Sequence, residues 1–265
     1  SLHDALPICS DTADEVITEH TKVVAITHVG NTTGAITDIA PIIRRAHEVG
    51  AIFILDACQS VPHLKVNFHA LDVDFAAWSA HKMYGPTGVG FLYGRRELLE
   101  ALPPANFGGS MVELAWMDQP AQYMVPPARF EAGTQPVAQV VAAGVAAEWM
   151  MNVGLENIEA HERTIAAELL KMGDIDGVRI LGPRENVNRI GTVAFDVAGV
   201  HPHDVGQFID AQGIAIRVGH HCAQPVHRHF GLYASNRASS GVYNSVDDAH
   251  ALVEAVAKVR PFFGL

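Results

Sequence analysis

Continuous apolar runs alternate with one helical pattern in the first part of the chain. Residues 22–29 are rich in β-branched side chains and end in a turn-like segment, residues 30–34. Behind Asp38, which can cap a helix, apolar residues recur at helical spacing as far as Gly50. Residues 51–57 form a second continuous apolar run, of the kind found in parallel strands that are covered on both faces. The pattern predicts a strand, a helix and a second, parallel strand.

Two more strands are expected before residue 95. Residues 75–80 are a third apolar run that leads directly into His81 and Lys82, and residues 88–94 return as a further strand. Ligands of open α/β sheets bind in the crevice where the strands end. We therefore expect the chemistry of the protein near the ends of these strands.

The hydrophobic pattern after residue 101 differs between three successive segments. Residues 102–127 are rich in proline and glycine with little periodicity, and we interpret them as an ordered loop. Apolar residues then recur at helical spacing in residues 136–151 and 156–172, which predicts two helices around a break at Gly154. Short strands and helices are expected to alternate in the remainder, at residues 178–181, 192–197, 204–212, 215–218 and 246–259.

These elements predict an α/β fold class with two domains. Residues 9–150 would form a partial large domain around a mainly parallel sheet, and residues 151–265 a smaller C-terminal α+β domain. Residues 1–8 look like a translated sequencing adapter and are excluded from the fold, so the natural chain is expected to begin further upstream. An ordinary disordered N-terminal tail is the alternative.

Composition narrows the class of protein. A hydrophobic content of 49% over 265 residues is enough for a real core. The net charge of −11 gives no broad positive field, so nucleic-acid binding is not expected. No apolar window approaches the ~20 residues that cross a bilayer, so no membrane span is expected. The cysteines are three and widely spaced (Cys9, Cys58 and Cys222), which argues against a disulfide framework and fits a cytoplasmic location.

Lys82 is the first candidate for chemistry. A lysine that forms a Schiff base must be held at a fixed point near groups that bind a cofactor's phosphate and ring. Lys82 closely follows an apolar strand, and Ser79 and His81 supply phosphate-binding donors within three residues. An ordinary lysine at the exit of a strand is the alternative.

Asp56 is the second candidate. It ends an apolar strand, where a buried carboxylate needs a cationic partner. A protonated pyridine nitrogen would be such a partner, and Gln59 could donate a hydrogen bond to an oxygen on the same ring. A helix N-cap or a salt bridge is the alternative for Asp56.

Cys222 is the third candidate. It lies in a loop with glycine and histidine neighbours after a short predicted strand, so its thiol is expected to be accessible. Arg217 and the two preceding histidines could favour the reactive thiolate. The alternatives are a small buried side chain, or a zinc site, although adjacent ligands converge poorly on one tetrahedral metal. The residues of that zinc site would be His220, His221, Cys222, His227 and His229.

With these three sites, the chain resembles the class V aminotransferase-like cysteine desulfurases, and within them the SufS-like and selenocysteine-lyase-like group. The resemblance runs from about Thr21 to the C-terminus. It rests on motifs at residues 27–31 (THVGN), 55–59 (LDACQ), 79–88 (SAHKMYGPTG), 129–134 (RFEAGT), 217–225 (RVGHHCAQP) and 237–239 (RAS), the last followed by Tyr243 and Asn244.

The resemblance implies pyridoxal 5'-phosphate (PLP) as the cofactor, in a PLP-dependent transferase fold of type I. It assigns Lys82 to the covalent link, Asp56 to the ring nitrogen and Gln59 to the ring oxygen. Ser79 and His81 would bind the phosphate. The substrate carboxylate would be held by Asn31 and Arg237, and Arg217 would shape the pocket around Cys222. Thr134 would reach the phosphate of a neighbouring subunit's cofactor, which implies a homodimer.

The implied reaction is cysteine desulfuration. Lys82 would act as the base, and the Cys222 thiolate would take the sulfur of L-cysteine as a persulfide while L-alanine leaves. An acceptor of the SufE or SufU type would carry the sulfur to iron–sulfur cluster assembly. A selenocysteine lyase, a cysteine sulfinate desulfinase and an inactive sulfur-relay scaffold with the same fold are the alternatives.

One departure from the family has a consequence for this chain. The family's ring-stacking histidine and phosphate-loop residues precede the position of Thr21, and the chain does not contain them. The chain by itself is therefore expected to bind PLP weakly or to fold poorly, because an incomplete sheet also leaves an unpaired edge.

Overall fold

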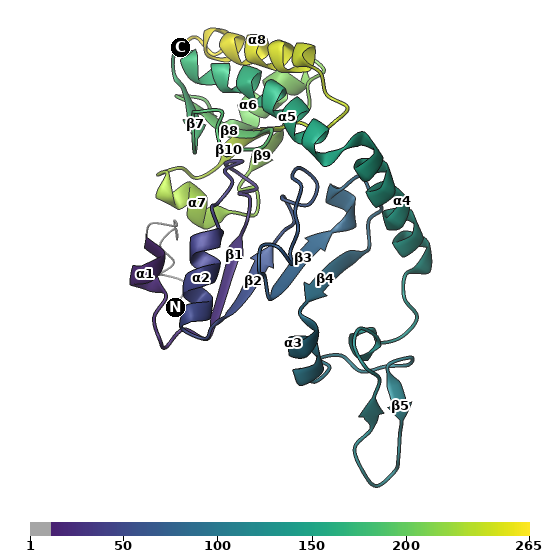
Figure 1. Cartoon of the computed structure of the whole chain (residues 1–265). Helices are drawn as coiled ribbons and strands as arrows, with labels where there is room; N and C mark the ends of the chain where they lie inside the picture. The colour runs from purple at the N-terminus through teal and green to yellow at the C-terminus, as the bar shows by residue number, and fades with distance from the viewer. Residues whose placement is uncertain (1–11) are drawn as a thin grey trace. The chain divides into compact units, whose positions relative to one another are not determined.

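A computed structural model describes residues 12–265 (Figure 1). The prediction for residues 1–8 therefore lies outside the described residues. The chain divides into two compact units. The first contains residues 12–27, 38–62 and 66–152. The second contains residues 28–37, 63–65 and 153–265.

The first unit is built on a four-stranded sheet. Its strands lie in the order β1 (Val23–Thr27), β2 (Ile52–Asp56), β3 (Phe75–Ser79) and β4 (Gly90–Gly94). The first three are parallel, and β4 pairs antiparallel with β3. The four strands predicted from the apolar runs are thus confirmed, each a few residues shorter than its run.

Helices cover this sheet and complete its core. Figure 1 shows α2 (Ala40–Glu48) lying alongside β1 and β2, with the short α1 (Ala13–Val16) next to it. Ile42 and Ala46 of α2 are fully buried with Phe53 and Leu55 of β2, which explains the helical spacing of these apolar residues. The N-cap of α2 is Ile39 and not Asp38. The predicted cap was therefore one residue early, although Asp38 Oδ1 does accept a hydrogen bond from the Ala40 N–H at 3.3 Å.

The remainder of the first unit contains more regular structure than predicted. A short helix, α3 (Arg96–Ala101), is followed by a two-stranded antiparallel hairpin, β5 (Val112–Leu114) and β6 (Gln122–Tyr123). A 3-10 turn (Ala128–Phe130) then leads to α4 (Val137–Val153). The hairpin falls inside the segment that was interpreted as a loop, because its strands are too short to show an apolar period.

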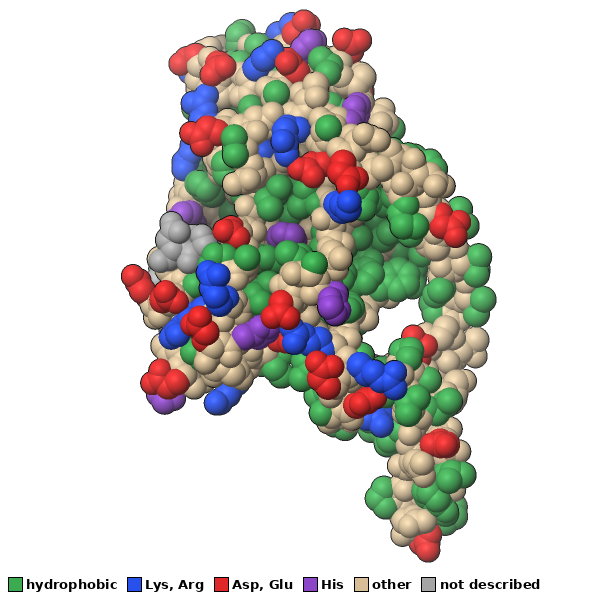
Figure 2. Space-filling model, in the orientation of Figure 1, with side chains coloured by type: hydrophobic (Ala, Val, Ile, Leu, Met, Phe, Trp, Pro, Cys, Tyr) green, Lys and Arg blue, Asp and Glu red, His purple; other side chains and the backbone are tan. Residues whose placement is uncertain are grey.

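Apolar side chains gather on the surface of α4, at the right of Figure 2. Val137, Val141 and Val145 are each more than 60% exposed, and Trp149 and Met151 are exposed further along the helix. A contiguous apolar face of this kind on a surface helix is typical of an interaction surface.

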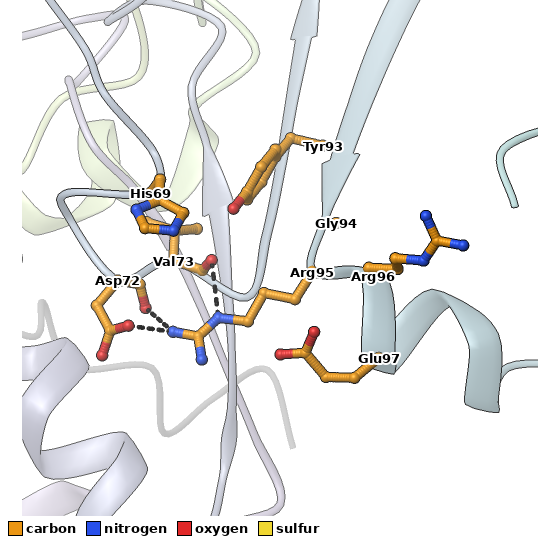
Figure 3. A pocket seen from close by; sticks show the side chains of 8 residues that line it. All are labelled: His69, Asp72, Val73, Tyr93, Gly94, Arg95, Arg96 and Glu97. Atoms are coloured by element: carbon orange, nitrogen blue, oxygen red, sulfur yellow. Dashed lines mark hydrogen bonds and ion pairs between the residues drawn. The ribbon is translucent and has the colours of Figure 1, made fainter.

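A buried carboxylate joins the elements at the start of β3. Asp74 is 5% exposed and accepts a hydrogen bond from the Phe53 N–H at 2.7 Å. It also pairs with His47 Nε2 at 3.0 Å and with Arg95 Nε at 3.1 Å. Figure 3 shows Arg95 reaching on to the exposed Asp72, beside a hollow of about 390 Å³. Because β3 begins here and Lys82 follows its other end, this hollow lies away from the predicted chemistry.

Substitution of Asp74 by asparagine should destabilise the first unit. The change removes the charge that faces His47 and Arg95, and we expect the free energy of unfolding to fall by about 2 kcal/mol. Denaturant unfolding monitored by circular dichroism measures the effect. Asp72→Asn is the matched control, because asparagine tolerates its positive φ of 61° and the side chain is largely exposed. An equal loss in the two variants would contradict the structural role of Asp74.

The second unit is an antiparallel sheet covered by helices. Its strands lie in the order β7 (Val178–Leu181), β8 (Thr192–Val197), β10 (Ser235–Ser239) and β9 (Arg217–Gly219). The helices are α5 (Leu155–Leu170), α6 (Pro202–Asp210), α7 (Gln224–His229) and α8 (Val246–Phe262), with a 3-10 turn (Lys171–Asp174) after α5. Ser245 and Asp248 form a capping box that starts α8.

The smaller α+β domain predicted from the sequence contains the expected strands and helices, together with β10 and α7, which were not predicted. The sequence of β10, Ser-Asn-Arg-Ala-Ser, is polar although Ser235 and Asn236 are fully buried. Nothing in its residue types indicates a central strand, because its place is fixed by pairing with β8 and β9.

Membrane-spanning potential is limited in the described part of the chain. No single helix there is long and apolar enough to cross a bilayer, and only the consecutive helices Val137–Val153 and Leu155–Asp174, taken together across a bend, meet that criterion.

Candidate functional site

The predicted cofactor residues cluster at the ends of two neighbouring strands in the first unit. Asp56 is the last residue of β2, and Ser79 is the last residue of β3. His81 and Lys82 follow in a 3-10 turn (Ala80–Lys82), and Gln59 lies in the turn after β2. Since β2 and β3 are parallel, with Asp56 opposite Ala77, these residues share one edge of the sheet.

The thiol of Cys58 lies among three of these side chains. Burial raises the pKa of the Cys58 thiol, and a hydrogen bond and the negative charge of Asp56 raise it further. The positive charge of Lys82 and a hydrogen bond with Ser79 act in the opposite direction. A carboxylate, a lysine and a hydroxyl therefore all act on one thiol at this edge of the sheet.

One premise about Asp56 was wrong. A buried carboxylate was expected at this position, but Asp56 is exposed in the structure. Its Oδ1 accepts a hydrogen bond from the Cys58 N–H at 2.9 Å, so the backbone of the following turn orients the carboxylate. The chain turns away directly after β2, and this leaves the last side chain of the strand at the open edge of the sheet. Lys82 and His81 are exposed at the same edge.

Thr134 belongs to the same unit but not to this cluster. It is exposed just before α4, next to Gly133. Among the described residues no hydrogen bond joins it to Ser79 or His81. The role that the resemblance implies for Thr134, in a neighbouring subunit, stays a prediction.

Cys222 lies in the second unit, in the loop between β9 and α7. It is exposed, as expected, and borders an open hollow of about 550 Å³ that is also lined by Arg217 and His221. His221 and Cys222 both have positive φ angles, 52° and 59°. Two consecutive residues other than glycine in the left-handed region cost free energy, and they persist only where neighbouring contacts hold them.

Two arginines flank the thiol because of the strand register. Arg217 of β9 lies directly opposite Arg237 of β10. Burial lowers the pKa of Arg237 and the charge of Arg217 lowers it further, while Cys222 raises it. The positive charges of the two arginines favour a carboxylate ligand beside Cys222.

Asn31 is fixed against the Cys222 loop. Its side-chain amide donates to His221 O at 2.6 Å, and Arg237 Nη1 donates to Asn31 O at 2.9 Å. Of the residues predicted to bind the substrate carboxylate, the structure thus brings Asn31 and Arg237 into direct contact. Arg237 Nε is buried and has no hydrogen-bond partner among the described residues.

A buried arginine holds the segment that carries Asn31. Arg189 is 2% exposed and donates to Thr33 O at 3.2 Å and to Thr192 O at 2.7 Å. Burial lowers its pKa to about 10. The backbone of Gly34 lies so close to Thr192 that this position requires glycine. Its φ is 72°, and a Cβ atom there would lie 2.3 Å from Thr192 O.

Ser235, which lies next to the site, was assigned no role from the sequence. Ser235 Oγ lies 3.0 Å from His221 Nε2 and 2.9 Å from His227 Nε2. His227 was considered only as a zinc ligand, and His221 as a zinc ligand or as a group that favours the Cys222 thiolate. They share this hydroxyl instead, and no group of three metal-ligating side chains occurs within residues 12–265. The signal for Ser235 is absent from the local sequence, because it depends on how β10 pairs.

His221 should make stability depend on pH. Burial, followed by the charges of Arg237, His227 and Arg217, lowers its pKa from 6.5 to about 4, and a backbone hydrogen bond to Ser235 opposes the shift. Between pH 6.5 and pH 4 the unfolded chain therefore binds more protons at this residue than the folded chain does. The free energy of unfolding should fall as the pH falls through this window. Denaturant midpoints at pH 7 and pH 4 measure it, and a His221→Gln variant that keeps the full pH dependence would refute the assignment.

The comparisons with known proteins agree on one family. A profile described as aminotransferase class-V matches residues 3–252. "Probable cysteine desulfurase 2" of Mycobacterium leprae is 51% identical over 247 residues, which are 93% of this chain and 59% of the relative. The crystal structure of the Escherichia coli cysteine desulfurase CsdA superposes with a TM-score of 0.90 at 35% identity, and covers 96% of this chain and 62% of its own. The apo structure of a cysteine desulfurase from Thermococcus onnurineus gives a TM-score of 0.91 at 35% identity, with coverages of 97% and 63%.

The fold is that of PLP-dependent enzymes of fold type I. The chain belongs to the class V aminotransferase family, whose members use PLP. It spans about three fifths of the length of the curated relatives that it matches.

Proposed function

We propose that the protein is a cysteine desulfurase that transfers sulfur from L-cysteine to Cys222 and releases L-alanine. The observation that carries the proposal is an exposed thiol, at the left-handed turn of the β9–α7 loop, beside two arginines. The same chain presents Lys82 and Asp56 together at the edge of a sheet. A thiol nucleophile and a cofactor lysine in one chain suit sulfur transfer better than transamination, which requires no thiol.

The residues of the first unit would hold PLP. Lys82 would bind it covalently, Asp56 would face the ring nitrogen and Gln59 the ring oxygen, and Ser79 and His81 would bind the phosphate. When bound, PLP supplies an electron sink that labilises bonds at the substrate α-carbon. Lys82 would then hold and return the α-proton as a base.

The residues of the second unit would hold the substrate and accept the sulfur. Arg237, oriented by Asn31 O, would bind the substrate carboxylate together with Asn31. Cys222, beside Arg217 and Arg237, is the nucleophile in this proposal. The thiolate attacks the substrate sulfur, the carbon–sulfur bond breaks with its electrons passing to the substrate carbon, and a proton returned to that carbon gives alanine.

Assembly and sulfur acceptor are part of the proposal. We propose a homodimer in which Thr134 approaches the partner's cofactor phosphate, and the apolar face of α4 is consistent with a subunit contact. The persulfide would pass to a SufE- or SufU-type acceptor for iron–sulfur cluster assembly in the cytoplasm.

Product analysis tests the proposal directly. The full-length protein, supplied with PLP and a reductant, should release alanine and sulfide in equal amounts from L-cysteine. Turnover limited to selenocysteine or to cysteine sulfinate would move the protein to one of those activities. PLP binding without alanine from any of the three substrates would leave a sulfur-relay scaffold.

A further inference from the structure

We propose that Ser235 and His227 are positioning residues that fix the ring of His221 in one tautomer and thereby hold the strained turn that presents Cys222. The proposal rests on the proposed function in one respect, namely that the position of the Cys222 thiol matters for sulfur transfer. The hydrogen-bonded series His227–Ser235–His221, called the relay below, lies in the second unit and can be tested without catalytic turnover.

The direction of every hydrogen bond in the relay follows from the bond that His227 makes to Ala223 O. His227 Nδ1 lies 2.9 Å from Ala223 O, and a carbonyl oxygen only accepts, so this nitrogen carries the proton. In the neutral ring Nε2 of His227 is then an acceptor, and the Ser235 hydroxyl donates to it over 2.9 Å. Having used its only proton, Ser235 Oγ accepts from His221 Nε2 over 3.0 Å. His221 is therefore protonated at Nε2 and bare at Nδ1.

The opposite direction is unfavourable. It would require a second proton on His227, which is 1% exposed, and a proton on Nδ1 of His221. That nitrogen is buried and has no hydrogen-bond partner among residues 12–265, so its N–H would be unsatisfied, whereas a bare lone pair costs less. Arg217 and Arg237 add positive charge near His221, which keeps its ring neutral and limits it to one N–H.

The relay bears on Cys222 through the backbone. The left-handed turn at His221 and Cys222 is held on one side by the hydrogen bond from Asn31 to His221 O. On the other side it is held by the buried His221 ring, whose hydrogen-bonded partner is Ser235 on the central strand β10. A strained turn persists only while such contacts over-determine it. Loss of the Ser235 hydroxyl frees the ring and lets the turn relax, which moves the thiol.

Nitrogen NMR of the histidine-labelled protein tests the relay first. We expect His221 to show a single neutral tautomer with a protonated Nε2 and an unprotonated Nδ1. Ser235→Ala should lose that signature, and Ser235→Thr, which keeps the hydroxyl, should retain it. His227→Phe removes the acceptor of Ser235 and should shift His221 toward the other tautomer, while His229→Phe, an exposed site on the same helix, should not.

Single-turnover persulfide formation on Cys222 then tests its consequence. Ser235→Ala should slow this step about tenfold or more with little change in the KM for cysteine, and Ser235→Thr should recover it. An unchanged His221 tautomer in Ser235→Ala, or an unchanged rate despite a lost tautomer, would overturn the proposal. If the unsubstituted protein forms no persulfide from cysteine, the proposed function fails, and the NMR result still decides whether the relay exists.

Discussion

Replacement of Lys82 by alanine is expected to abolish alanine release from L-cysteine and to remove the visible absorbance of protein-bound PLP. Lys82 is placed at the exit of β3, in the same cluster as Asp56 and Ser79. It would serve as both the covalent anchor and the base, so a rate loss of about a thousandfold or more is expected. Absorbance spectra with added PLP and an assay for alanine measure the two effects separately.

The matched control for this prediction is Lys258→Ala, because Lys258 is an exposed lysine on α8. That variant should keep both the absorbance and the activity. A Lys82→Ala protein that still yields a lysine-dependent absorbance band would place the cofactor on another lysine. Retained absorbance with lost alanine release in Lys82→Ala would assign to Lys82 the role of base alone.

The parallel part of the fold could be predicted because its strands are buried on both faces. Residues such as Phe53 and Leu55 form uninterrupted apolar runs, and such runs are visible without knowledge of their neighbours. Asp56 is different. Its position at the end of a strand was correctly predicted, but its exposure depends on where the following turn goes, which the residue types do not specify.

In the second unit, by contrast, the central strand β10 could not be predicted from its residue types. β10 is central in its sheet, yet it contains a buried serine and the buried Asn236, whose side-chain amide has no hydrogen-bond partner among the described residues. Polar residues in a central strand contradict the usual apolar pattern, so the strand was not predicted. Arg237 was found only because its motif resembles a family, and its pairing with Arg217 across two strands is a consequence of register.

The relay from His227 to His221 could not be predicted for the same reason. Ser235 is 14 residues from His221 along the chain, and the contact exists because β10 pairs with β9 just before the Cys222 loop begins. Metal binding by the histidines around Cys222 was only an alternative from the sequence, because adjacent ligands converge poorly on one metal. The structure directs two of these four histidine rings to one hydroxyl, which leaves the thiol exposed and unligated within the described residues.

Replacement of Cys222 by alanine should separate the desulfurase from its nearest rival. Cleavage of cysteine by the proposed route transfers sulfur to this thiol, so Cys222→Ala should lose sulfide release and persulfide formation from cysteine. Elimination of selenium from selenocysteine needs no thiol acceptor, because selenium leaves more readily, and that activity should be little affected. Mass spectrometry of the peptide that contains Cys222, after a single turnover, locates the transferred sulfur.

Cys9→Ala is the control for this substitution, because no role is assigned to Cys9, and it should retain both activities. Cys222→Ser should resemble Cys222→Ala, since a hydroxyl at the same position cannot form a persulfide. Full activity of Cys222→Ala on cysteine would contradict the persulfide route. It would favour a PLP lyase that releases sulfide directly, in which Arg217 and Arg237 serve only the substrate carboxylate and the strained turn at Cys222 has no part in the chemistry.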